Sequence, residues 1–164
     1  MTDEDVKARL THVQATACTM LAEAGGDNLD GSSVEERIGV GCAIRNRVKT
    51  RRFGDTFRDV CLRRKQFSCW TPSRDQNHRR LMAVAANLVA GVLPDPILVE
   101  TLYLAEGVIG GAIMDSTHGA THYYAPKAMR PKGSKPGWVF LNGKDGPEHD
   151  PTAIISGHRF YQVA

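Results

Sequence analysis

Apolar residues in the first part of the chain recur with a helical period. Between residues 4 and 23 they are spaced three and four apart, which places them on one face of a helix. These positions are Val6, Leu10, Val13, Ala17, Met20 and Leu21. Gly25 and Gly26 follow the last of them, as glycines commonly do where a helix ends. The pattern predicts one amphipathic helix that stops at a glycine pair.

Capping signals and breakers divide the following residues into further helices. Ser33 with Glu36, or Ser32 with Glu35, has the spacing of a capping box and predicts a helix that runs to about residue 49. Three more helices are predicted, over residues 56–63, from the capping signal "SRDQ" at 73–76 to about residue 91, and over residues 97–108.

The pattern changes after Asp115, where the chain becomes aromatic, β-prone and rich in turns. Short strands are predicted within "GATHYYAP" (119–126), "WVFL" (138–141) and "RFYQV" (159–163). No repeat, low-complexity tract or long linker is visible. The sequence therefore predicts one α+β domain over residues 1–164, predominantly α-helical with a small β element.

Composition narrows the class of protein without selecting a function. The chain has 164 residues, of which 41% are hydrophobic, and a formal net charge of +3, which suits a globular protein that tolerates anionic polymers as partners. Its most apolar stretch contains Glu100 and Glu106, so stable membrane insertion is not expected. The acidic, polar first ten residues do not resemble a signal peptide, which predicts a cytoplasmic origin.

The four cysteines show no C-x-x-C spacing, which argues against a zinc ribbon or a thioredoxin-like site. They are Cys18, Cys42, Cys61 and Cys69. Reduced thiols are the expectation, and a bridge between Cys61 and Cys69 is left open for an oxidising compartment.

Glu23 is the first candidate for chemistry. It follows Met20 by three residues and Leu21 by two, so it borders the apolar face of its helix. The helix dipole and partial burial both disfavour a charged carboxylate in that place, and a protonated glutamic acid is what a general acid requires. The glycines that follow leave room for a bulky polymer. Residue type and spacing alone favour the alternative, a surface glutamate at a frayed helix end.

Four stretches in consistent order resemble a known family. They are "LAEAGGDNLDGSSVEERIGVGCAIRNRV", "VCLRRKQFSCW", "AEGVIGGAIMDSTHGATHYYAP", and the closing "GW" with "ISGHRFY". They are similar to motifs of the cell-wall hydrolases that include the spore-cortex-lytic enzymes, over residues 17–161. The resemblance implies a fold like goose-type lysozymes and lytic transglycosylases, cleavage of peptidoglycan glycan strands, and no cofactor or metal.

By this resemblance Glu23 takes the position of the catalytic acid. Many relatives carry arginine where this chain has Gly25 and glutamate where it has Asp27, so the resemblance assigns no role to those two positions. The implied route uses one glutamate as acid and then base, and it closes a 1,6-anhydro ring on N-acetylmuramic acid. Attack by water would instead make the enzyme a muramidase. Candidates for a second carboxylate are Asp27, Asp30, Glu35 and Asp115.

Further residues are candidates for substrate binding. They are Gln66, Ser68, Thr121, Tyr123 and Trp138, which offer an amide, hydroxyl groups and aromatic faces. Tyr123 and Tyr124 should face opposite sides of a strand, with Tyr123 preferred for the cleft. Phe67 is expected in the core.

Two rival functions remain on the sequence evidence. A zinc-dependent N-acetylmuramoyl-L-alanine amidase or peptidase would use three of four histidines, His118, His122, His149 and His158, although the chain lacks an H-E-x-x-H motif. A nucleic-acid-binding module would use the basic residues 45–65, but no recognition motif accompanies them. Residues 45–65 could equally attract anionic wall polymers or form a solvated face.

The favoured expectation is a monomeric phage endolysin whose partner is bacterial peptidoglycan and not nucleic acid. Such a protein would stay in the host cytoplasm before lysis and then reach the cell wall or periplasm.

Overall fold

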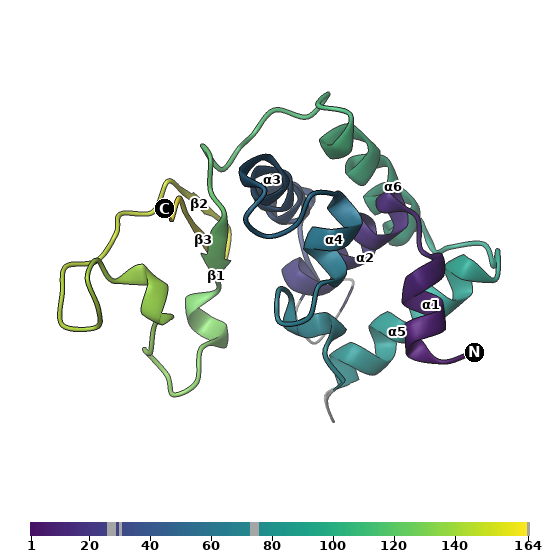
Figure 1. The fold of residues 1–164 in the computed structure, drawn as a ribbon, viewed down its shortest axis with the longest axis horizontal. Helices are drawn as coiled ribbons and strands as arrows, with labels where there is room; N and C mark the ends of the chain where they lie inside the picture. Colours follow the sequence, from purple (N-terminus) through teal and green to yellow (C-terminus); the bar gives the residue numbers. More distant parts are fainter. Residues whose placement is uncertain (26–28, 30, 73–75, 164) are drawn as a thin grey trace.

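The computed structural model describes residues 1–25, 29, 31–72 and 76–163. Within these residues, six α-helices and a three-stranded antiparallel sheet form an α+β fold, as predicted (Figure 1). The helices occupy one side of the view in Figure 1, and the sheet with the turn-rich C-terminal segments occupies the other.

The predicted helix over residues 4–23 is wrong, because two helices occupy this stretch. These are α1 (Asp3–Arg9) and α2 (His12–Gly25). Between them Leu10 is extended, with ψ of 137°, and is buried. Thr11 and Gln14 then form a reciprocal capping pair, with hydrogen bonds of 3.0 and 3.1 Å. Their bonds start a new helix inside a continuous apolar period.

The remaining helices follow the predicted pattern closely. They are α3 (Val34–Thr50), α4 (Phe57–Leu62), α5 (Gln76–Val89) and α6 (Pro96–Ile109), with a short 3₁₀ turn η1 (Ser68–Trp70) after α4. The capping box of Ser33 and Glu36 is confirmed at the start of α3. Residues 73–75 of the other capping signal lie outside the described residues.

Helix α2 lies at the centre and packs against α3, α4, α5 and α6. Residues 15–22 of α2 are buried without exception, so the core surrounds this part of the helix on all sides. Glu23 therefore stands at the end of a central, buried helix, next to the last residues that the core covers.

The sheet consists of β1 (His122–Tyr124), β2 (Ala153–Ile155) and β3 (His158–Tyr161) in the order β1-β3-β2. The strands predicted within 119–126 and 159–163 are confirmed. The strand predicted over 138–141 is wrong, because residues Gly137–Val139 form the 3₁₀ turn η3 and only Phe140 makes an isolated bridge.

The sheet packs on α3 through small residues. Phe160 of β3 is fully buried against Ala43 of α3 and Ala120. A Cβ atom at Gly39 would come within 2.7 Å of the Phe160 ring, so only glycine permits this approach. The close packing brings β1 alongside the helical half of the molecule, where α2 ends.

No helix in the described part of the chain is both long and apolar enough to cross a membrane. Glu100 and Glu106, which interrupt the most apolar stretch, both lie within α6.

Candidate active site

The fold brings Glu23 of α2 and Tyr123 of β1 together. The Tyr123 hydroxyl donates a hydrogen bond of 2.9 Å to Oε2 of Glu23. Tyr124 points to the other face of the strand, where it is buried with Val139 and Tyr161. The two tyrosines therefore face opposite sides, as expected for neighbours in a strand, and Tyr123 is the one beside Glu23.

Two neutral donors flank the Glu23 carboxyl group. Burial, and then the charge of Glu23, raise the pKa of the Tyr123 phenol well above its ordinary value. Burial raises the pKa of the Cys69 thiol, and the charge of Glu23 and a hydrogen bond with it act in the same direction. Both groups therefore stay protonated near neutrality and are able to donate to a carboxylate.

Arg47 of α3 lies behind this pair. Its Nε donates to the Thr121 carbonyl at 2.6 Å, and Nη1 donates to Oε1 of Gln66 at 3.2 Å. The guanidinium carbon lies 4.7 Å from the ring centre of Phe53 and 4.9 Å from that of Phe67. Burial lowers the pKa of Arg47, while Tyr123 and Glu23 act against the shift, so a buried cation borders the site.

Arg45, like Arg47, is buried and belongs to the internal hydrogen bonding of the fold. Its Nη1 donates to the carbonyls of Val108 and Ile113 at 3.1 and 2.7 Å. Neither the attraction of anions nor a solvated face, the two interpretations of the basic residues 45–65, holds for Arg45 and Arg47. These side chains are anchors for backbone carbonyls.

Asp115 also serves the fold. Asn46 donates to its Oδ2 at 2.9 Å, Gly119 donates to the same oxygen at 2.8 Å, and the backbone and hydroxyl of Thr117 donate to Oδ1. Burial alone would raise the pKa of Asp115, but these hydrogen bonds outweigh it and lower the pKa to about 2. Both oxygens of this second-carboxylate candidate are engaged, by its own loop and by Asn46 of α3.

Of the other candidate second carboxylates, the structure describes only Glu35. Glu35 is exposed on α3, and Asp27 and Asp30 lie outside the described residues. From the sequence, Glu36 was expected only to cap a helix. In the structure its Oε1 also accepts a hydrogen bond of 3.1 Å from the Gly157 amide and lies 3.6 Å from Nδ1 of His158.

The centre of the His158 imidazole ring is in turn 6.0 Å from the centre of the Tyr123 phenol ring. Glu36 thus lies beside His158, and the His158 ring packs edge-on against the Tyr123 ring. This arrangement was not predicted from the sequence. The only local signal was the capping glutamate itself, whose Oε2 serves the cap and whose Oε1 is left for another contact.

The substrate-binding candidates occupy different places. Gln66 is half-buried and linked through Arg47 to Thr121, whose own hydroxyl is buried and hydrogen-bonds Nδ1 of His122 at 2.9 Å. Ser68 is exposed at the start of η1. Trp138 is half-buried and packs against His122, at 5.0 Å between ring centres. The structure therefore gathers Gln66, Thr121 and Tyr123 near Glu23 and Arg47, with Trp138 beside the neighbouring residue of β1.

The histidines do not assemble into a metal centre. Within the ranges that the structure describes, no group of three or more histidine, cysteine, aspartate or glutamate side chains could hold a metal ion. Burial, followed by the charges of Arg47 and Arg52, lowers the pKa of His122 to about 4. His122 is therefore a neutral ring between Phe53 and Trp138.

The family model described as Cell Wall Hydrolase matches residues 31–161, a range that contains Arg47, Gln66 and Tyr123 and begins after Glu23. No curated protein and no solved structure matches the chain. Because the matched range covers most of the sequence, the chain belongs to the cell wall hydrolase family.

Proposed function

We propose that this cell wall hydrolase cleaves the glycan strand of peptidoglycan between N-acetylmuramic acid and N-acetylglucosamine, with Glu23 as the catalytic acid. Family membership supports peptidoglycan as the substrate. The hydrogen bond between Tyr123 and Glu23 is the observation that carries the role of Glu23, because that residue precedes the matched range.

The geometry around Glu23 suits a group that gives up a proton and takes one back. Tyr123 donates to Oε2, which leaves Oε1 to carry the proton toward the glycosidic oxygen. When that proton is transferred, the bond from C1 of the muramoyl sugar to the leaving oxygen breaks and a carboxylate remains. The hydrogen bond from Tyr123 stabilises the negative charge.

The second step in this proposal needs no other carboxylate. The N-acetyl group of the muramoyl residue stabilises the cationic C1. The oxygen of the C6 hydroxyl then bonds to C1 while the Glu23 carboxylate takes the hydroxyl proton. The product is a 1,6-anhydro sugar. The engagement of Asp115 by its own loop and by Asn46, and the exposure of Glu35, support this route over the hydrolytic one.

The fold in this proposal is lysozyme-like, with the substrate held between the helices and the sheet. Gln66 and Ser68 would orient the N-acetyl groups, and Trp138 would offer a face for stacking on a sugar. The buried Thr121 would act indirectly, by holding Arg47 through its carbonyl. The half-buried states of Gln66 and Trp138 support their part in such a site.

Product analysis tests the proposal directly. Purified peptidoglycan is digested with the wild type, with Glu23→Gln, and with Glu35→Gln as a control for the same change on an exposed helical glutamate. We expect anhydromuramoyl products from the wild type and the control, and at least a hundredfold less from Glu23→Gln. Reducing muramoyl ends would make the enzyme a muramidase, whereas free peptides or an active Glu23→Gln would refute the proposal.

We also propose that the enzyme acts as an endolysin, kept in the host cytoplasm until a membrane pore opens. In support, all four cysteines are buried and free, so folding requires no disulfide and suits a reducing compartment. Expression in a bacterial host should cause lysis only when a pore-forming protein is produced as well. Equally rapid lysis without the pore would contradict this setting.

A further inference from the structure

A basic pocket of about 610 Å³ lies between α1 and the segment of residues 62–72. Its apolar lining includes Leu62, Phe67 and Trp70. The indole N–H of Trp70 donates to Thr19 of α2 at 2.9 Å, one helical turn before Glu23. Segment 66–70 thus borders the candidate active site through Gln66 and Cys69, and it borders the pocket through Phe67 and Trp70.

Three consecutive cations form one rim of this pocket. Arg63, Arg64 and Lys65 are exposed, and their side chains make no hydrogen bond or ion pair within the part of the chain that the structure describes. Lys65 has a φ of 67°, a left-handed conformation that costs about 1 kcal/mol for a residue with a Cβ atom. The charges of these three side chains are therefore available to an anionic ligand in the pocket.

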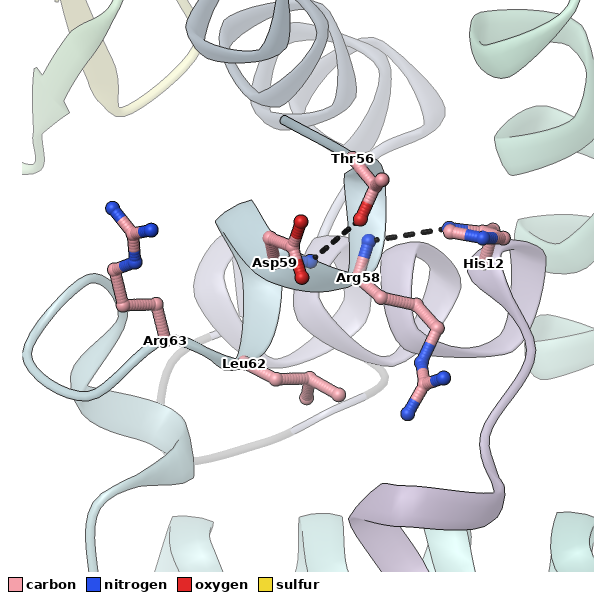
Figure 2. A pocket seen from close by; sticks show the side chains of 6 residues that line it. All are labelled: His12, Thr56, Arg58, Asp59, Leu62 and Arg63. Atoms are coloured by element: carbon pink, nitrogen blue, oxygen red, sulfur yellow. Dashed lines mark hydrogen bonds between the residues drawn. The ribbon is translucent and has the colours of Figure 1, made fainter. Parts of the chain in front are cut away.

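The adjoining pocket shows which arginine is already engaged. It has a volume of about 580 Å³ and shares Leu62 and Arg63 with the basic pocket. Figure 2 shows the side chains of Arg58, in α4, and Arg63, which follows it, pointing in different directions. The Arg58 guanidinium donates to the carbonyls of Lys7 and Ala8 in α1 at 3.3 and 3.1 Å, so it fastens α4 to α1.

Lys7 on the opposite wall is also engaged, in an ion pair of 2.9 Å with Glu4. The free positive charge of the basic pocket therefore comes from residues 63–65. A ligand for this pocket needs acidic groups for the rim and small apolar groups for the lining of Leu62, Phe67 and Trp70.

We propose that this pocket binds the acidic peptide stem of the wall polymer, an inference that rests on the proposed function. A stem peptide carries carboxylates and methyl side chains on one short chain, which matches the cations and the apolar lining. A phosphate polymer would satisfy the cations alone. Because segment 66–70 borders both sites, a stem held here would fix the position of its glycan strand relative to Glu23.

Direct binding of a peptide tests this inference without catalysis. The probes are a synthetic stem peptide with free carboxylates and the same peptide with those groups amidated, titrated into Glu23→Gln by calorimetry. We expect saturable binding of the free acid, binding at least tenfold weaker for the amide, and an affinity that falls as salt rises. Absence of saturable binding, or equal affinity for the amide, would overturn the inference.

Charge-matched variants locate the site. In Glu23→Gln, Arg63→Ala with Arg64→Ala should raise the Kd of the acidic peptide at least tenfold. Lys132→Ala with Lys144→Ala removes the same charge from exposed positions elsewhere and should change the Kd less than twofold. Equal effects of the two pairs would mean that net charge alone acts. Tighter binding of a glycerol phosphate polymer than of the peptide would reassign the pocket to phosphate.

The two proposals fail separately. If the peptide does not bind while wild-type cleavage depends on Glu23, only the stem-binding pocket is wrong. If Glu23→Gln cleaves normally, the proposed chemistry is wrong, and the peptide titration still decides what this pocket holds.

Discussion

Tyr123 and Glu23 are 100 residues apart in sequence and 2.9 Å apart in the structure, joined by a hydrogen bond from phenol to carboxylate. The bond crosses from the sheet to the central helix. The two oxygens of Glu23 therefore differ, because only Oε2 accepts the hydrogen bond from the phenol.

Removal of the Tyr123 hydroxyl should impair catalysis more than folding. A hydrogen bond to a charged group contributes about 1.5–3 kcal/mol, so we expect Tyr123→Phe to lower kcat about 10- to 100-fold with little change in KM. The rate of muropeptide release measures this change. Tyr124→Phe, on the opposite face of β1, is the control and should retain nearly full activity. Equal losses in the two variants would contradict a specific role for Tyr123.

Replacement of Arg47 should destabilise the protein even when the charge is kept. Lysine cannot donate to both Thr121 and Gln66 in the planar geometry of the guanidinium group. We expect Arg47→Lys to lower the free energy of unfolding by about 2 kcal/mol, measured by urea denaturation. The exposed Arg51 at the end of the same helix provides the matched Arg→Lys control, with an expected change below about 0.5 kcal/mol. Similar values for both would mean that Arg47 is not an anchor.

His122 should make stability depend on pH in the acid range. Its pKa is lowered to about 4 in the folded protein by burial and by Arg47 and Arg52, whereas the ordinary value is 6.5. Between these values the unfolded chain binds more protons, so this contribution is fully present above about pH 6.5 and is lost as pH falls toward about 4. The melting temperature of the wild type should therefore fall more steeply than that of His122→Gln across this range.

The titration of His122 also allows a direct measurement. NMR should show its imidazole protonating near pH 4, and Arg52→Ala should raise that pKa because one neighbouring positive charge is gone. A midpoint near 6.5 in the folded wild type would show that His122 is not held neutral by its surroundings.

Chelation of metal ions should leave activity unchanged. The four histidines of the zinc hypothesis have other surroundings, such as the rings beside His122 and the Glu36 carboxylate beside His158. We expect digestion of peptidoglycan at the same rate before and after treatment with excess EDTA. Loss of activity with EDTA and its return with zinc would favour the amidase or peptidase instead.

Local signals in the sequence were sufficient for most helices. The capping box of Ser33 and Glu36 marked the start of α3, because its hydrogen bonds join residues only three apart. The break between α1 and α2 was missed, since the apolar period continues through Leu10 and concealed the capping pair of Thr11 and Gln14. The three-residue strand β2 lies too close to turns to produce a clear alternation.

Which of the basic residues are buried could not be predicted from local signals. Arg45 and Arg47 have the same chemistry as the exposed Arg63 and Arg64, and nothing local distinguishes them. Their burial depends on carbonyls that the chain supplies 63 to 74 residues later. Only the folded chain therefore distinguishes the buried Arg45 and Arg47, which bind backbone carbonyls, from the exposed cations at residues 63–65.

The sequence by itself determined the helical framework, the family resemblance and Glu23 as the candidate acid, because periodicity, caps and motif order are properties of neighbouring residues. Only the tertiary structure decided that Tyr123 donates to Glu23 and that Arg47 donates to the Thr121 carbonyl. It also decided that Glu36 lies beside His158 and that Asn46 of α3 donates to Asp115. The contacts around Glu23 join distant segments, and the packing of the sheet on α3 selects them.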